Sequence, residues 1–575
     1  MRRRGLPLVA LALIVPAALI MLATAHRGSL LGKGGQAAAD ARHGPSGTPA
    51  SGSTTDRGAG RKQGQGMATA GVSPSSGSSS CHSSPGVSMS TDTQPSQSGP
   101  TSSASLPAGP VRFRVYDTTG RRLDWAAFRR LQENGKGEDG DNDMILDPAT
   151  LRVRSGWPLY EDGGNPALDR PRGAAALSMA WPTSDGYSAL ILDLPRPGTY
   201  VFNFLAAQQA VAQLRTALSD RPGYLPSPAF STSWRSARSE LALAGAARTE
   251  ADRGRHGARA YEAAVHAQLL LLREFGTQYL AQRAQAAPGL SPWQGPGENP
   301  PSIGFTFDAI RPGARDLQRV SALVGGRPGA AAVRLVFDLS ERPSYYAATV
   351  RAAHKAGIRV VGQFLDSSDV AAVSQEQWQR RVAEFVGGLP DVDTWEVGNE
   401  VNGNWLGSGV AAKIAYAAAY VKTHTRASTL LTLYWQLGED DPQHSVFTWA
   451  STLPQSTVRN LDQIGLSVYP EDHPLGAAFD RVFRTLHGAF PHQRLGVTEL
   501  GYWSADLGHT WWWGSPHDPI GKGRQAVADL YTRAVFGYPY SAGGTYWWYF
   551  LEEVRPSDPV FRTFSHVGDV VARSC

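Results

Sequence analysis

The stretch that decides the fold reads Thr394-Trp395-Glu396-Val397-Gly398-Asn399-Glu400, a mostly apolar run that ends in an amide and a carboxylate. Similar short apolar runs recur through the C-terminal half of the chain, and most are separated by Ala-rich or amphipathic stretches. The eight runs are Ile303–Asp308, Ala332–Asp338, Ile358–Leu365, Thr394–Glu400, Leu430–Gln436, Gln463–Tyr469, Leu495–Glu499 and Gly544–Phe550. The stretches that we expect to be helical are 342–356, 376–388, 409–424, 476–489 and 522–536.

This alternation predicts the fold class. Near-continuous apolar strands that alternate with helices indicate a parallel sheet covered by helices. Eight such units over roughly 250 residues predict a closed (β/α)₈ TIM barrel in the C-terminal half. An open, doubly wound α/β sheet is the alternative. No Gly-rich phosphate loop follows the first strand, which argues against a nucleotide-binding sheet of that kind.

The chemistry of a barrel of this kind is carried at the C-terminal ends of its strands. Those ends are dominated by carboxylates, amides and aromatic residues, and they show neither a His/Cys cluster with metal spacing nor an obvious Ser-His pair. Carboxylates can act as acid/base pairs, and aromatic rings stack on sugars, so the combination points to glycosidic bonds. We predict no metal and no cofactor.

Two strand ends carry a specific resemblance. The fourth run ends in Asn399-Glu400, and the seventh ends in Thr498-Glu499. Over about residues 300–555 the sequence resembles clan A glycoside hydrolases, which carry catalytic glutamates on strands four and seven. The resemblance implies that Glu400 is the acid/base and Glu499 the nucleophile of a retaining glycosidase. It also implies that Asn399 binds the 2-hydroxyl group of the sugar.

Other residues are candidates for substrate binding or support. Tyr469, at the end of the sixth run, is in a position to donate to Glu499, although core packing is the other reading. Arg334 in the second run can reach the nucleophile or be structural. Glu396 has the strand parity of Glu400 but lies roughly 13 Å deeper, which favours a paired polar group inside the barrel over a catalyst. Asp308 and Asp338 either bind sugar hydroxyls or cap the next helices.

Tryptophans are the expected sugar platforms. Trp547 and Trp548 are adjacent in the last run, so one should face the pocket and the other should pack outward. Trp405 and Trp503 follow the two glutamates closely and are the better candidates for sugar contact than Trp511-Trp512-Trp513, which can equally be a loop-stabilising cluster.

The preceding part of the chain predicts three further regions. Residues 1–26 combine Arg2-Arg3-Arg4 with an apolar run, which is typical of a signal peptide or an uncleaved membrane anchor. Residues 27–107 are rich in Ser, Gly, Thr and Pro and predict a disordered linker. Residues 108–290 predict an accessory module of a small mixed β-sheet or sandwich plus a helical hairpin, with strands over 111–116, 187–194 and 199–205 and helices over 206–218 and 233–286. The barrel then occupies residues 291–575.

These regions predict an exported protein, which is secreted, periplasmic or anchored to the outside of the cytoplasmic membrane. The formal charge of +5 over 575 residues forms no concentrated basic stripe, so we expect no nucleic-acid partner. Cys81 and Cys575 are the two cysteines, and whether they pair stays open. The partner that we expect is an oligo- or polysaccharide. The alternative function is a catalytically inactive barrel that binds glycans. A barrel enzyme with other chemistry would need a buried Lys or several His at the strand ends, and the sequence has neither there.

Overall fold

The computed structural model describes residues 106–132, 143–285, 301–308, 310–438, 441–502 and 520–574. The predicted export segment, residues 27–105 of the predicted linker, both cysteines, Trp503 and Trp511-Trp512-Trp513 lie outside the described residues. No helix within the described ranges has the length and apolar character that crossing a membrane requires.

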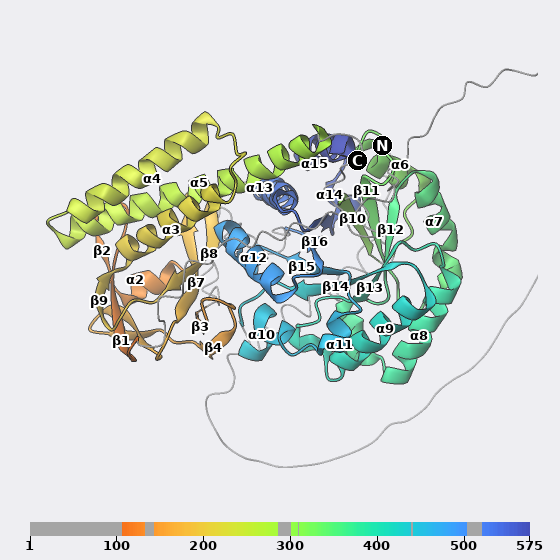
Figure 1. Cartoon of the computed structure of the whole chain (residues 1–575), viewed down its shortest axis with the longest axis horizontal. Coiled ribbons are helices and arrows are strands. Elements are labelled where there is room, and N and C mark those ends of the chain that lie inside the picture. Colours follow the sequence, from red (N-terminus) through yellow and green to blue (C-terminus); the bar gives the residue numbers. More distant parts are fainter. Residues whose placement is uncertain are drawn as a thin grey trace, which may run out of the picture. The chain divides into compact units, whose positions relative to one another are not determined.

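The C-terminal half is a closed eight-stranded barrel, as predicted (Figure 1). Each strand pairs in parallel with the next along the chain, and the last pairs with the first. The strands are β10 (Ser302–Asp308), β11 (Ala331–Val336), β12 (Arg359–Gln363), β13 (Thr394–Gly398), β14 (Ser428–Tyr434), β15 (Gln463–Val468), β16 (Arg494–Leu500) and β17 (Ser541–Trp547). All six residues of β11 are buried, which explains why these strands read as apolar runs without alternation.

Helices cover the outside of the barrel (Figure 1). They are α6 (Ala314–Ala322), α7 (Pro343–Lys355), α8 (Gln375–Gly388), α9 (Val410–His424), α10 (Val446–Ala450), α11 (Gln455–Val458), α12 (Phe479–Ala489), α13 (Ile520–Ala534), α14 (Phe550–Glu553) and α15 (Pro559–Ser574). Short 3₁₀ turns lie at η2 (Ser367–Ala372), η3 (Asn404–Leu406), η4 (Pro442–His444), η5 (Gly476–Ala478) and η6 (Val535–Gly537). Helix α8 shows how these helices start: Ser374 accepts from the Gln377 backbone, and the Gln377 side chain accepts in return.

Two small sheets and three long helices precede the barrel. One sheet has the order β2-β1-β6-β5, and β9 also pairs with β1. The other sheet has the order β4-β3-β7-β8. The strands are β1 (Gly109–Tyr116), β2 (Arg122–Leu123), β3 (Met144–Leu146), β4 (Val153–Gly156), β5 (Tyr160–Asp162), β6 (Asn165–Arg170), β7 (Ala176–Thr183), β8 (Gly186–Asp193) and β9 (Gly198–Val201). The helices are α2 (Trp125–Arg130), α3 (Phe202–Ser219), α4 (Pro228–Ala246) and α5 (Glu250–Gln285), and the sheet-plus-helical-hairpin class is confirmed.

The strand expected over 199–205 is wrong in its second half, because β9 ends at Val201 and α3 begins at Phe202. Phe202 is fully buried and packs on Phe113 and Trp181, with ring centroids 5.4 Å and 4.7 Å away. The Asn203 side chain accepts from the Tyr116 backbone N–H at 2.8 Å. These tertiary contacts override a local sequence of high β-propensity. The helix expected over 233–286 is likewise two helices, α4 and α5.

The sheet β4-β3-β7-β8 contacts two loops at the C-terminal ends of the barrel strands. At one edge, the Val153 N–H of β4 donates to the Thr448 hydroxyl of α10 at 3.0 Å. At the other edge, the Ser188 hydroxyl of β8 accepts from the Ala477 N–H at 3.0 Å. Thr448 follows β14 and Ala477 follows β15, so the accessory sheet spans the loops after the fifth and sixth barrel strands.

Candidate active site

Glu400 lies at the C-terminal end of the fourth barrel strand, two residues beyond the end of β13. Its φ of +49° is in the left-handed region, which is uncommon for a residue with a side chain and re-aims the carboxyl group at the end of the strand. The Ser467 hydroxyl donates to Oε1 at 2.7 Å, and the Ser367 hydroxyl donates to Oε2 at 2.8 Å. Both oxygens of Glu400 are therefore held by neutral donors.

Glu499 lies on the seventh strand, β16, and its partners differ in kind. The Tyr469 hydroxyl donates to Oε1 at 2.7 Å, and Arg334 Nη1 donates to Oε2 at 2.9 Å. A charged partner of this kind favours the ionised carboxylate. Glu400 and Glu499 thus sit in contrasting surroundings, one with hydroxyl partners and the other with a guanidinium.

Burial and the charge of Glu499 raise the pKa of Glu400 well above its ordinary value, against the opposing effect of the two serine hydroxyls. Burial also raises the pKa of Glu499, and Arg334 and Tyr469 offset only part of that rise. The exposed fractions of the two residues are 8% and 3%. Of the two carboxyl groups, Glu400 is the one that keeps its proton more readily.

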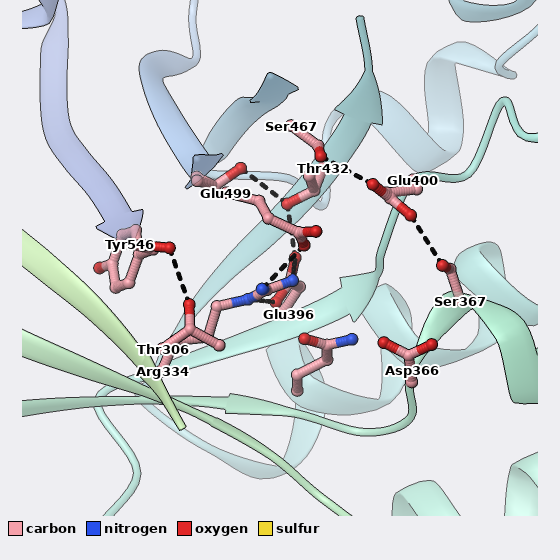
Figure 2. Close-up of polar contacts among 12 residues, drawn as sticks. Thr306, Arg334, Asp366, Ser367, Glu396, Glu400, Thr432, Ser467, Glu499 and Tyr546 are labelled. Atoms are coloured by element: carbon pink, nitrogen blue, oxygen red, sulfur yellow. Dashed lines mark hydrogen bonds and ion pairs between the residues drawn. The ribbon is translucent and has the colours of Figure 1, made fainter. Parts of the chain in front are cut away.

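Arg334 connects Glu499 to a third glutamate inside the barrel (Figure 2). Its Nε and Nη2 donate to Glu396 at 2.6 Å and 3.1 Å, and the side chains of both residues are fully buried. Burial lowers the pKa of Arg334, but the charges of Glu396 and Glu499 outweigh it and raise that pKa. Glu396 also accepts from the Thr432 hydroxyl. It is a paired polar group within the barrel, as its depth suggested.

Strand β15 brings the two candidate catalytic groups together. Ser467 on this strand pairs in register with Glu499 on β16, and its hydroxyl reaches across to Glu400. Tyr469 follows Ser467 by two positions, so both point to the same face, and Tyr469 contacts Glu499. Because the pKa of Glu400 responds to the charge of Glu499, the two carboxyl groups form one electrostatic site.

Of the predicted support residues, Tyr469 and Arg334 both lie against Glu499. Asn399 is 2% exposed, and its Oδ1 has no hydrogen-bond partner among the described residues. A buried acceptor without a partner is costly, so a donor from a ligand or a water would suit this position. Its role in binding the sugar 2-hydroxyl stays a prediction.

The two adjacent tryptophans at the end of the last strand lie in different surroundings: Trp547 is the last residue of β17 and Trp548 follows it. Trp548 is half-buried, and the Arg334 guanidinium lies 5.6 Å from its ring centroid, so it belongs to the mouth of the barrel. Trp547 is fully buried, packs on Phe564 of α15 and donates its Nε1–H to Glu553 at 3.0 Å. Trp547 is therefore placed in the outer helical layer, away from any sugar, because neighbours on a strand alternate.

Trp405 lies in η3, directly after the Glu400 loop, and is half-buried. Its ring packs edge-to-face on Tyr434 at 5.4 Å, and Tyr434 in turn packs on His473 at 5.2 Å. These three aromatic residues come from the loops or strand ends four, five and six and form a row on the Glu400 side of the mouth. The residue predicted as its counterpart, Trp503, lies outside the described residues.

The sequence reasoning missed Ser367, Ser467 and Thr432. Serine and threonine are too common for their identity to be a signal, but Ser467 could have been found, since it shares the parity of Tyr469 two positions on. Asp338 accepts from the Ser340 N–H at 2.7 Å and from the Ser340 hydroxyl at 2.6 Å, which makes it a local turn former. Within the described ranges, no group of three or more His, Cys, Asp or Glu is placed to hold a metal ion.

No protein-family model matches the chain, and no curated protein matches it. Solved structures similar to it include an FMN-binding β-glucuronidase from Facaelibacterium prausnitzii L2-6, with 14% identity, 44% of this chain and 38% of that chain covered, and a TM-score of 0.31. The GH113 β-mannanase AaManA from Alicyclobacillus acidocaldarius is 15% identical. The match covers 47% of this chain and 97% of that chain, with a TM-score of 0.35. A family 1 β-glucosidase from Thermotoga maritima is 10% identical. The match covers 45% of this chain and 85% of that chain, with a TM-score of 0.31. The chain thus spans 38% of the length of the β-glucuronidase.

The structure shows two of the features that the predicted resemblance implied. It has the closed barrel of eight parallel strands, and it places Glu400 at the end of the fourth strand and Glu499 on the seventh. The chain therefore has the predicted closed (β/α)₈ barrel, with a glutamate at the end of the fourth strand and another on the seventh.

Proposed function

We propose that this protein is a retaining glycoside hydrolase that acts on an extracellular or cell-envelope polysaccharide. The observation that carries the proposal is the unequal pairing of the two glutamates. Glu400 is held by two serine hydroxyls and is the more readily protonated group, whereas Glu499 is held by Arg334 and Tyr469. Two carboxyl groups that differ in how readily they keep a proton are what a double displacement needs.

In the first step, a Glu499 oxygen attacks the anomeric carbon and the glycosidic C–O bond breaks. Glu400 transfers its proton to the leaving oxygen, so that the leaving sugar departs as an alcohol. In the second step, the ionised Glu400 takes a proton from water, the water oxygen attacks the same carbon, and the ester to Glu499 breaks. Two inversions retain the configuration of the sugar.

The test uses two variants and a panel of four soluble polysaccharides (a β-glucan, a xylan, a galactomannan and a chitosan) together with aryl glycosides. Glu499→Gln should lower kcat by more than about 10³-fold on every substrate that the wild type cleaves, because no nucleophile remains. Glu400→Ala should lose activity on the polysaccharides but keep more on aryl glycosides whose leaving groups need no proton. Product analysis by mass identifies the bonds cleaved, and NMR of the first product identifies its anomeric configuration.

Full activity in both variants would contradict the proposal. Glycan binding by a wild type that cleaves nothing in the panel would favour the inactive glycan-binding barrel. An inverted first product would leave a glycosidase but reject the double displacement.

We further propose that the chain is exported and is either secreted, periplasmic or tethered by residues 1–26. Support comes from the basic and apolar pattern of that segment alone. N-terminal sequencing of the protein from fractionated cells distinguishes a cleaved signal from a retained anchor.

A further inference from the structure

The connection between β4 and β5 presents a large aromatic side chain to solvent in an unfavourable backbone conformation. Trp157 has an exposed fraction of 56% and a φ of +46°. A bulky residue in the left-handed region is an outlier, since glycine or asparagine would be accommodated with less strain. An exposed indole adds little to the core that could offset this strain. Strained residues that persist without a packing reason point to function.

The surroundings hold this connection in place. The Trp157 N–H donates to the Asp143 carbonyl at 2.8 Å. Three residues further on, Tyr160 begins β5 with an exposed fraction of 37%, and its hydroxyl donates to Asp169 at 3.2 Å. The segment therefore offers two exposed aromatic side chains, anchored by a backbone and a side-chain hydrogen bond, which limits the entropy lost when a ligand binds.

Trp157 follows a strand that sits on the rim of the candidate active site. Gly156, its neighbour in β4, lies so close to Pro442 of η4 that an added Cβ would be 3.3 Å from the proline Cγ. Figure 1 shows β4 beside α10, the helix that follows η4 in the loop after the fifth barrel strand. The aromatic connection is thus continuous with a loop at the mouth of the barrel.

The same loop holds the segment that carries Glu400. The Asn402 side chain donates to the carbonyls of Tyr434 and His444 at 2.9 Å and 2.8 Å, and it accepts from the Tyr434 N–H at 2.7 Å. Asn402 is fully buried and lies two residues after Glu400. A chain of contacts therefore runs from the segment of Glu400 through Asn402 and η4 to β4, so the connection that carries Trp157 adjoins the loop that holds the Glu400 segment.

We propose that Trp157 is a distal sugar-binding platform for the leaving-group portion of a polymeric glycan. This inference rests on the proposed function, because the acid/base stands beside the leaving oxygen and so defines the side on which the leaving chain extends. The occupant is a glycan several sugars long, whose apolar C–H ring faces pack on the indole face. The accessory module thereby adds a subsite to the cleft of the barrel.

The experiment removes the ring and keeps the backbone. Trp157→Asn is the test variant, because asparagine tolerates the left-handed region. Trp157→Tyr restores an aromatic face, and Leu225→Asn is the matched control, since Leu225 is 72% exposed in the connection between α3 and α4. Each change is made in the full chain that also carries Glu499→Gln, and migration is measured in native gels that contain the β-glucan, xylan, galactomannan or chitosan.

The Glu499→Gln chain should be retarded by at least one polysaccharide. Trp157→Asn should weaken that retardation roughly five- to thirtyfold, the loss typical of truncating an aromatic anchor, whereas Trp157→Tyr and Leu225→Asn should preserve it. In the otherwise wild-type chain, Trp157→Asn should lower kcat/KM for the cleaved polysaccharide by a similar factor relative to kcat/KM for an aryl glycoside.

Equal retardation of the Trp157→Asn and Leu225→Asn chains would overturn the inference, as would a lack of retardation in all four gels. Neither result bears on the roles of the two glutamates, which depend on the activity of Glu499→Gln and Glu400→Ala. Conversely, an active Glu499→Gln enzyme would overturn the proposed function through turnover, a readout separate from gel migration.

Discussion

At the scale of single residues, the site depends on which groups donate to which carboxylate. Glu400 receives hydrogen bonds from two hydroxyls, and Glu499 receives one from a hydroxyl and one from a guanidinium. Hydrogen bonds of this kind stabilise the ionised form, and a positive charge does so most strongly. Burial is the largest influence on the pKa of each group, and the donors oppose it to different degrees.

Ser467→Ala tests this dependence. Burial raises the pKa of Glu400, and the Ser467 hydroxyl opposes that rise by stabilising the carboxylate. Removing the hydroxyl should raise this pKa further, so the acid stays protonated to higher pH and the alkaline limb of the kcat/KM profile moves to higher pH. The measurement is the pH dependence of kcat/KM on a substrate that needs leaving-group protonation. An alkaline limb that stays in place, or that moves equally in the control Ser340→Ala, would contradict the role of Ser467.

The candidate residues could be predicted only where their kind is rare at a strand end. Glu400 and Glu499 stand out because each ends an apolar run, and Tyr469 and Arg334 stand out by strand position. Trp157 gave no signal, because its exposure and its left-handed backbone depend on how β4 meets the barrel.

At the scale of elements, periodicity predicted the barrel well. The eight apolar runs correspond to β10 through β17, and the ends differ by a few residues. Runs buried on both faces leave little ambiguity once helices alternate with them. The segment at Phe202 was harder, since its aromatic residues suit a strand and only the aromatic core around Phe113 and Trp181 selects a helix.

Strand β17 depends on glycine at a position that periodicity does not reveal. Gly544 has a φ of +118°, and a Cβ there would lie 2.1 Å from the Val497 carbonyl oxygen of β16. Gly544→Ala should therefore lower the free energy of unfolding by about 3 kcal/mol or more, from overpacking plus backbone strain. Urea unfolding measures the change. The control Gly488→Ala lies in α12 with open space around it and should be neutral or slightly stabilising. Equal stability of the two variants would show that β17 can relax.

At the scale of the whole described chain, a buried ion pair joins the accessory helices to the barrel. Arg221, after α3, donates to Asp480 of α12, and Tyr538 donates to the same carboxylate at 2.8 Å. Burial raises the pKa of Asp480, but Arg221 and Arg484 outweigh it and hold the pKa below its ordinary value. Arg221 is 4% exposed and also lies 5.2 Å from the centroid of the Phe275 ring.

Asp480→Asn should leave the Arg221 charge buried without its partner. The free energy of unfolding at neutral pH should fall by about 3 kcal/mol, the lower end of the range for such pairs, because the Asp480 side chain keeps 13% exposure. A depressed folded-state pKa contributes stability above the unfolded-state pKa and loses it as pH falls through the folded-state value, so the difference from wild type should shrink in acid. Denaturant unfolding at several pH values measures both effects. The control is Asp220→Asn, which removes the exposed pair Arg484–Asp220 and should lower the free energy of unfolding by less than about 1 kcal/mol. An equal loss of stability in both variants would rule out a special role for the buried pair.

The link from Arg334 to two carboxylates has an electrical consequence. One guanidinium is shared between the buried carboxyl groups of Glu396 and Glu499, which fixes the position of Glu499 inside the barrel. On the proposed chemistry, positive charge grows on the sugar ring as its bond to the leaving oxygen lengthens. The Glu499 carboxyl group is held in position by Arg334 before a glycan binds, so stabilising that positive charge requires no reorientation of the site.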